Sequence, residues 1–334
     1  MRASEVAALT GGTLVGPDRD VEGVAPLETA GPDDLAFATR PPASPPRAGV
    51  LLACGPSAPT TVVVADPKLA FIQVLRHLFP EVHPEGVQAG AWVHPSARLG
   101  RNVRVYPGAY VGPDVEIGDD SVVWPNAVLL AGTRIGRACV VGPGAVVGYA
   151  GFGLHPTPEG PRPVPQVGRT VLEDGVNIGA NTCVDRAFLE ETRLGTGTQI
   201  DNLVQIGHNC HLGRNVVIAG QAGLSGSVVV EDGAVLGGQA GVADHVTVGR
   251  SARVGSQAGV HRDLEGDRAW LGTPAVGAAL AGRIFAAWKD LPDLVHRVRR
   301  LERRLEDLLD RREPDATGRT APGDGDRGSD GGSP

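Results

Sequence analysis

The sequence is poor in aromatic residues, in cysteine and in long apolar runs, and each shortage excludes a class of protein. Aromatic residues make up only 4% of the 334 residues, and the four cysteines are far apart, without a CxxC pair. A disulfide scaffold and a zinc knuckle are therefore excluded, and free thiols suit a reducing cytoplasm. No run reaches the roughly 18 apolar residues of a membrane-spanning helix, and no signal peptide is expected.

An excess of positive charge is also lacking. The formal net charge is −7, from 31 lysines and arginines against 38 aspartates and glutamates. Proteins that bind nucleic acid usually carry a basic patch, so we expect no nucleic-acid partner. No group of histidine, cysteine and carboxylate residues has the spacing of a metal site, and we expect none.

Glycine, in contrast, is abundant, with 48 glycines beside 27 prolines. Such a composition is typical of a disordered chain, of collagen or of a repeat protein. Disorder is excluded because valine, leucine and isoleucine are frequent, and collagen because glycine does not recur at every third position. A repeat protein remains.

The repeat is a branched aliphatic residue at every sixth position. The series runs over residues 87–147, returns at 172–184, slips by four residues and continues over 194–260. A period of six fits neither an α-helix nor an alternating strand, but it suits a β-solenoid in which each hexad forms a short strand and a corner. Three hexads close a triangular coil of about 18 residues, so we expect about eight or nine coils.

The segments outside the hexads predict a further domain and a helical end. Residues 1–86 read as a small α/β domain, with helices over 5–9, capped by Ser4, and over 66–79, and with strands at 50–54 and 61–65. Residues 87–262 form the solenoid, interrupted at 148–171 by an excursion that is either a substrate-covering loop or a tolerated insertion. Residues 275–312 are expected to be helical, with an apolar seam over 291–308, and 313–334 to be disordered.

One pair of residues in the solenoid suggests chemistry. Asp201 and His208 are seven residues apart, which places them on neighbouring faces near a corner. A histidine oriented by a carboxylate is the standard general base, although a surface histidine with a chance acidic neighbour is the alternative. One coil beyond His208 comes Gly226, whose backbone N–H could stabilise an oxyanion. A further coil leads to Asp244 and His245, so that His208, Gly226 and His245 form a stripe on successive coils.

Longer motifs carry a resemblance to a known family. The sequence has GFG at 151–153, PQVG at 165–168, IGAN at 178–181 followed by DR at 185–186, and IDNLVQIGHN at 200–209. In order and spacing they resemble the UDP-3-O-acylglucosamine N-acyltransferases of lipid A biosynthesis, and the likeness runs from residue 1 to about 310. The resemblance implies a mainly β protein, a left-handed parallel β-helix of hexapeptide repeats with a small N-terminal α/β domain and C-terminal α-helices.

The resemblance also implies a reaction and an assembly. Such a protein is a cytoplasmic homotrimer with active sites between adjacent solenoids. It moves a 3-hydroxyacyl chain from the phosphopantetheine thioester of acyl carrier protein to the 2-amino group of UDP-3-O-(3-hydroxyacyl)-glucosamine, without metal or cofactor. His208 matches the general base, Asp201 its orienting carboxylate and Gly226 the oxyanion N–H. The expected substrate-binding residues are His245, Phe37, Phe152, Gln166, Asn202 and Gln205.

The sequence departs from the family pattern at two places. The family usually has an Asn-Pro-Lys-Tyr stretch after the phenylalanine of the N-terminal domain, and its tyrosine helps to hold uracil. Here Phe37 is followed by ATRPPAS, and the usual Asp-Arg-Gly reads Asp185-Arg186-Ala187. The alternatives are a hexapeptide acyltransferase that uses acyl-CoA or a different nucleotide amino sugar, and a non-catalytic scaffold in which His208 and Asp201 are idle.

Overall fold

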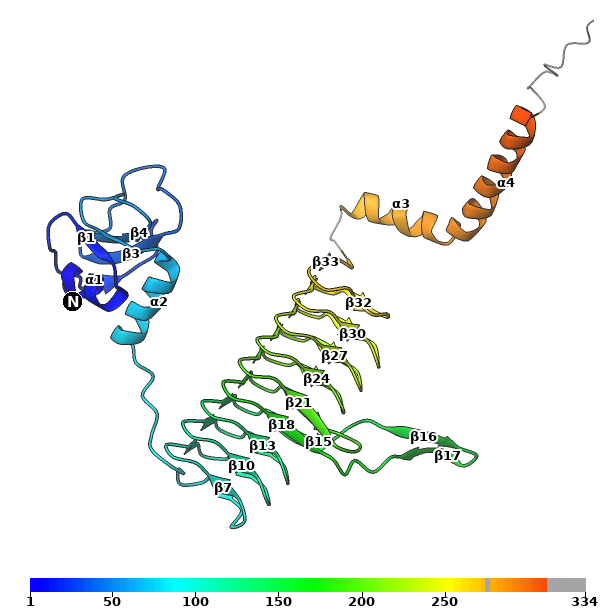
Figure 1. The fold of residues 1–334 in the computed structure, drawn as a ribbon, viewed down its shortest axis with the longest axis horizontal. Coiled ribbons are helices and arrows are strands. Elements are labelled where there is room, and N and C mark those ends of the chain that lie inside the picture. Colours follow the sequence, from blue (N-terminus) through cyan, green and yellow to red (C-terminus); the bar gives the residue numbers. More distant parts are fainter. Residues whose placement is uncertain (274–276, 311–334) are drawn as a thin grey trace, which may run out of the picture.

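The computed structural model describes residues 1–273 and 277–310, and a parallel β-solenoid makes up most of them (Figure 1). Its strands are mostly two residues long and recur every six residues. They stack into three parallel sheets of eight, nine and nine strands, which are the faces of the triangle. The register joins residues 18 apart, as where Gln205 pairs with Gly223. The predicted fold class, a left-handed parallel β-helix, is confirmed.

Each sheet takes one strand from every coil. The first contains β7 (Arg98–Leu99), β10 (Glu116–Ile117), β13 (Arg134–Ile135), β18 (Arg169–Leu172), β21 (Glu191–Leu194), β24 (His211–Leu212), β27 (Val229–Val230) and β30 (Thr247–Val248). The second contains β8 (Arg104–Val105), β11 (Val122–Val123), β14 (Val140–Val141), β19 (Asn177–Ile178), β22 (Gln199–Ile200), β25 (Val217–Ile218), β28 (Val235–Leu236), β31 (Arg253–Val254) and β33 (Ala269–Trp270). The third contains β6 (Trp92–Val93), β9 (Tyr110–Val111), β12 (Val128–Leu129), β15 (Val146–Ala150), β20 (Cys183–Arg186), β23 (Gln205–Ile206), β26 (Gly223–Leu224), β29 (Gly241–Val242) and β32 (Gly259–Val260).

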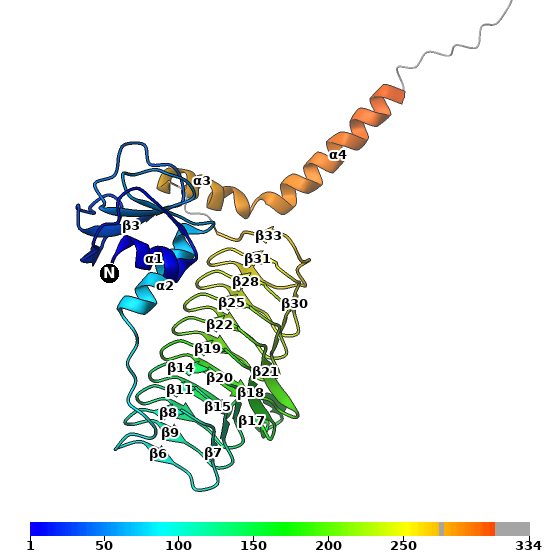
Figure 2. The same cartoon turned by 60° about the vertical axis from the view of Figure 1, so that its left-hand side comes forward.

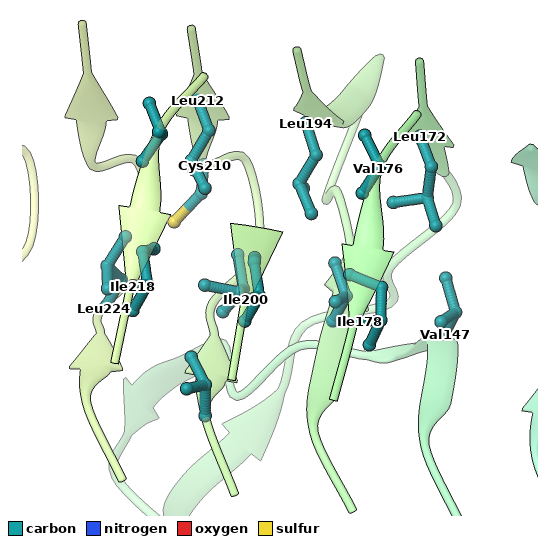
Figure 3. Close-up of a cluster of buried hydrophobic side chains, with 14 of the residues drawn as sticks. Val147, Leu172, Val176, Ile178, Leu194, Ile200, Cys210, Leu212, Ile218 and Leu224 are labelled. Carbon is teal, nitrogen blue, oxygen red and sulfur yellow. The ribbon is translucent and has the colours of Figure 1, made fainter. Parts of the chain in front are cut away.

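The core of the solenoid is the ladder of aliphatic residues that the hexads predict. Ile178, Ile206 and Leu236 are fully buried, and Figure 3 shows how such side chains from successive coils meet in the interior. Each buried side chain of this size contributes roughly 1.5–3 kcal/mol, so the ladder supplies most of the stability of the solenoid. The ladder leaves the outward positions free for function.

Two irregularities interrupt the coils on the third face. Between β15 and β18 the chain leaves the solenoid and forms an antiparallel hairpin of β16 (Leu154–Thr157) and β17 (Gly160–Pro163), which projects from the coils in Figure 1. The second is the four-residue slip, which the structure places between β20 and β21. There Val184 pairs with Ile206, a separation of 22 residues instead of 18.

The N-terminal domain is a five-stranded sheet with two helices, joined to the first coils by an extended segment (Figure 2). In sheet order its strands are β1 (Thr13–Val15), β5 (Thr61–Val63), β4 (Val50–Ala53), β3 (Asp34–Ala38) and β2 (Gly23–Val24), and the helices are α1 (Ala3–Thr10) and α2 (Pro67–Leu78). Helix α2 begins as predicted, because the Asp66 side chain accepts a hydrogen bond from the Leu69 N–H at 3.0 Å. The predicted cap of α1 is wrong. Ser4 lies inside that helix, and its hydroxyl donates to Asp18 at 2.9 Å.

The C-terminal segment forms α3 (Ala278–Trp288) and α4 (Leu291–Asp310). The apolar seam predicted over 291–308 lies on α4 and is largely exposed in the single chain, with Leu301 62% and Leu305 58% exposed. The tail expected at 313–334 lies outside the described residues. In the part of the chain that the structure describes, no helix has the length and apolar character needed to cross a bilayer.

Candidate active site

A groove of about 1140 Å³ runs along the outside of the third sheet. Its floor includes Gly223, Gly241 and Gly259, one from each of three successive coils, and an added Cβ at Gly223 or Gly241 would meet no atom within 4 Å. Tyr149 and Phe152, at the start of the excursion, line the same groove. The floor is smooth because these outward positions carry no side chain, and one wall comes from the excursion.

His208 lies in this groove, at the corner after β23, between two glycines. A Cβ atom added at Gly226 would lie 2.7 Å from Nε2 of the ring, and one added at Gly151 would lie 2.5 Å from the His208 Cβ. Real Cβ contacts essentially never come under 3.0 Å, so a larger residue at 226 or 151 would force the His208 side chain to shift. The coil arithmetic predicts the stacking of Gly226 on His208, and the structure confirms it. The contact of Gly151 was not predicted.

The tautomer of His208 follows from the neighbouring asparagine. Nδ1 of His208 is 3.2 Å from Oδ1 of Asn209. This amide is oriented by the backbone, since its Oδ1 also accepts from the Phe188 N–H at 2.9 Å and its Nδ2 donates to the Leu189 carbonyl at 3.1 Å. An amide oxygen can only accept, so Nδ1 must carry the proton in the neutral ring. Nε2 then has the free lone pair that a general base requires.

The backbone beside Nε2 offers a donor. The Gly226 N–H makes no hydrogen bond to any described residue, whereas the next N–H along, that of Ser227, donates to the His208 carbonyl at 2.8 Å. A free backbone N–H next to the base is suited to stabilise an oxyanion. The corner therefore presents a proton acceptor and a hydrogen-bond donor to the same space.

The stripe continues on the next coil, as the spacing predicts. Asp244 and His245 both line the groove. The backbone of His245 is left-handed, with φ 58°, and its N–H donates to the Gly226 carbonyl at 3.1 Å. His261, for which no role was predicted, also lines the groove.

The predicted pairing of Asp201 with His208 is not present among the described residues. Asp201 lies at the corner before β23 and His208 at the corner after it, so the two are at opposite ends of this strand. The carboxylate of Asp201 accepts from the Asn202 N–H at 2.7 Å and from the Gly220 N–H at 3.0 Å. In this chain Asp201 therefore stabilises a corner of the solenoid, and Asn209 is the residue that contacts the ring.

The predicted substrate-binding residues divide into two groups. Phe152 and Gln205 line the groove with His208 and His245, and Phe152 is 85% exposed. The others lie elsewhere. Phe37 packs on Phe71 in the N-terminal domain, with ring centroids 4.9 Å apart. The Gln166 Nε2 donates to the Val164 carbonyl at 3.2 Å. The Asn202 amide oxygen accepts from the Ala180 N–H at 2.7 Å.

The structure adds Asp185, which belongs to a matching motif but had no predicted role. It lies on β20, is only 9% exposed and lines the groove. Its Oδ2 accepts from Nε2 of Gln205 at 2.9 Å. Burial raises the pKa of Asp185 to about 6, although the Gln205 bond and the charge of His208 act in the opposite direction. Counting along the hexads does not lead to this residue, because the four-residue slip follows it.

Comparison with known proteins identifies the family. The chain is 47% identical to the UDP-3-O-acylglucosamine N-acyltransferase of Oleidesulfovibrio alaskensis, over 92% of this chain and 98% of the relative. It is 44% identical to UDP-3-O-acylglucosamine N-acyltransferase 1 of Gloeobacter violaceus, over 92% and 96%. This chain belongs to the UDP-3-O-acylglucosamine N-acyltransferase family. It is therefore an acyltransferase, and the resemblance seen in the motifs is confirmed.

Repeat models and a solved structure agree with the fold. The model described as bacterial transferase hexapeptide (six repeats) matches residues 96–131 and 191–226, and the hexapeptide repeat of succinyl-transferase matches 114–149. The UDP-N-acetylglucosamine acyltransferase of Campylobacter jejuni superposes with a TM-score of 0.51 at 24% identity, over 69% of this chain and 92% of that one. At this identity the likeness is evidence for the left-handed β-helix alone.

Proposed function

We propose that this N-acyltransferase acts in lipid A biosynthesis, moving a 3-hydroxyacyl chain from acyl carrier protein to the 2-amino group of UDP-3-O-(3-hydroxyacyl)-glucosamine. The names of the relatives support the acceptor, and the resemblance of the motifs supports the donor. The observation that carries the chemistry is His208, with Nε2 available in the groove and Gly226 against it.

The geometry suits direct transfer. The amine nitrogen attacks the thioester carbonyl carbon, and Nε2 of His208 takes the proton that the amine loses as the C–N bond forms. The carbonyl oxygen becomes an oxyanion, which the free N–H of Gly226 stabilises. The oxyanion then collapses, the C–S bond breaks, and His208 returns the proton to the leaving sulfur. Atoms and protons balance without a cofactor.

The cysteines do not favour a covalent route. Burial raises the pKa of Cys139 to about 11 and that of Cys210 to about 12, so both stay as unreactive thiols at neutral pH. Burial also raises the pKa of Cys183. These three thiols are therefore poor nucleophiles, the exposed Cys54 does not line the groove, and a histidine acting on the amine is the simpler mechanism.

The acting form is proposed to be a cytoplasmic homotrimer with each groove completed by a neighbouring subunit. Two features support this assembly. The apolar seam of α4 is exposed in the single chain, and Phe152 and Tyr149 are 85% and 62% exposed beside the groove. Second and third copies of the same chain would cover these apolar surfaces. Sedimentation at micromolar concentration should give a trimer, and a stable monomer would contradict the shared site.

The donor and acceptor can be tested in one assay. Purified protein is given UDP-3-O-acyl-glucosamine with either 3-hydroxyacyl carrier protein or the matching acyl-CoA, and the N-acylated product is measured by mass spectrometry. We expect product with the carrier protein. Product with acyl-CoA alone, or only with another nucleotide amino sugar, would favour the alternative acyltransferase. That alternative has one observation behind it, because Phe37 packs on Phe71 and no tyrosine follows it.

A further inference from the structure

Asp185 stands apart from the other carboxylates of the protein by its burial. Among the described residues it is the only charged side chain in the buried class, at 9% exposure. Its Oδ2 is held by Gln205, whereas Oδ1 accepts no hydrogen bond from a described residue. Both Asp185 and Gln205 line the groove that contains His208. A half-satisfied carboxylate thus lies in the wall of the active-site groove.

This placement is unfavourable for the fold. Burial disfavours the ionised form, which is why the pKa of Asp185 rises to about 6. An asparagine could accept the same bond from Gln205 without that penalty. Titratable groups that are kept in such positions cluster at functional sites, where their charge is used.

The surroundings of Asp185 leave His208 as its cationic partner. On its own strand, Arg186 is turned away, because its guanidinium donates to the carbonyls of Gly148 at 2.8 Å and Ala131 at 2.7 Å. The positive charge that lowers the pKa of Asp185 is that of His208. The other polar or titratable groups lining the groove or beside it are Cys183, Cys210, Tyr149, Ser225, Asp244, His245 and His261.

We propose that Asp185 is a positioning residue for His208, whose carboxylate stabilises the imidazolium formed when Nε2 accepts the proton of the amine. Gln205 holds the carboxylate in the groove wall. The two side chains share the groove without being in ion-pair contact. The neutral ring gains little from Asp185, but the charge of the protonated ring is attracted by the carboxylate across the groove, so the interaction strengthens toward the transition state. The proposal rests on the proposed role of His208 as general base. It assigns to Asp185 the part that the family resemblance implied for Asp201.

The first test uses turnover as a function of pH. Asp185→Asn keeps the shape and the bond to Gln205 but removes the charge, so kcat at pH 8 should fall about 10²-fold while KM changes by less than about twofold. Because the carboxyl of the wild type itself becomes protonated as the pH falls through about 6, the difference in kcat between wild type and Asp185→Asn should become smaller there. The acid limb of the kcat/KM profile should also move to lower pH. Asp232→Asn, which removes a carboxylate that caps the Arg214 N–H on another corner, is the matched control and should keep wild-type turnover.

The second test needs no substrate and does not depend on the acyl acceptor. Carbon-13 NMR follows the Asp185 carboxyl through its titration, with Asp185→Asn assigning the signal. In His208→Gln the pKa of Asp185 should rise by about 0.5 or more, because the imidazolium charge is gone, and in His245→Gln it should not move.

The outcomes separate the two proposals. An Asp185 pKa that is the same in His208→Gln overturns the coupling, whatever the turnover of Asp185→Asn. Normal turnover of a folded Asp185→Asn protein, beside an inactive His208→Ala protein, overturns the role of Asp185 and leaves the general base intact. Normal turnover of a folded His208→Ala protein refutes the role of His208 as general base, and with it the role of Asp185, whereas the donor and acceptor are tested separately by the assay with acyl carrier protein.

Discussion

The contact between Gly226 and His208 allows a sharp test of the site. In Gly226→Ala, the new Cβ would lie 2.7 Å from both Nε2 and Cε1 of the ring. Ordinary contact begins near 3.4 Å, so the ring must move by about 0.7 Å. The room for this movement is limited, because Gly151 lies against the base of the same side chain, where an added Cβ would be 2.5 Å from the His208 Cβ and 2.9 Å from Cδ2. The substitution retains the backbone N–H at 226, so it isolates the position of the base from the oxyanion donor.

The expected effect is large on turnover and small on folding. Misplacing a catalytic group by about 1 Å can lower the rate by roughly 10²-fold, and we expect a loss of this order in kcat. The assay is steady-state turnover beside thermal unfolding. His208→Ala gives the lower limit of activity. Gly238→Ala is the folding control, since Gly238 has the same position in its hexad and an added Cβ would meet only the Gly220 carbonyl oxygen, at 3.3 Å.

One result would refute the reasoning. Suppose that Gly226→Ala keeps near wild-type turnover and unfolds at the same temperature as Gly238→Ala. The ring of His208 then has room to move without loss of activity. His208 would then be a surface residue of the solenoid, and the base would have to be sought on the excursion at 148–171.

Three further predictions follow from the same geometry. His208→Ala should lower kcat by about 10²–10⁴-fold with little change in KM. The loss of kcat should be smaller in Asp201→Asn, and His245→Ala should either lose an intermediate amount or mainly raise KM. Equal losses of kcat in all three variants would contradict this order. Asp185→Asn should stabilise the fold above pH 6. The pKa of the Asp185 carboxyl is about 6 in the native protein and 3.8 in the unfolded chain. The free energy of unfolding of the wild type therefore declines by up to about 3 kcal/mol as the pH rises through this window. Urea unfolding at pH 4 and pH 7 measures the stability difference between wild type and Asp185→Asn, and the same difference at both pH values would contradict the prediction. Deleting the chain from Glu313 should leave activity and sedimentation unchanged, since the groove is lined by residues up to His261; a large loss of either would show a role for that segment.

The hexads are predictable from the sequence because a β-solenoid is a local, periodic structure. An inward aliphatic residue every six positions fixes both the strand and its register, so residues 18 apart lie on neighbouring coils. That arithmetic also finds the column of His208, Gly226 and Asp244 without any knowledge of the structure. The helix that starts at Asp66 is equally local, since its cap is one side chain and one N–H. Ser4 shows the limit of such rules, because a partner 14 residues away, Asp18, holds its hydroxyl instead.

The environment of His208 was decided by the tertiary structure. Gly151 reaches the ring at the point where the excursion leaves β15, and Asp185 lies in the groove because β20 pairs with β23 at a separation of 22 residues. Neither the excursion nor the slip obeys the period that makes the rest of the chain predictable. Sequence spacing likewise joins Asp201 to His208, whereas in space β23 separates them. The period determined the scaffold, since each hexad buries its own side chain, and the two breaks in the period determined which groups surround the base, since those contacts form only between distant segments.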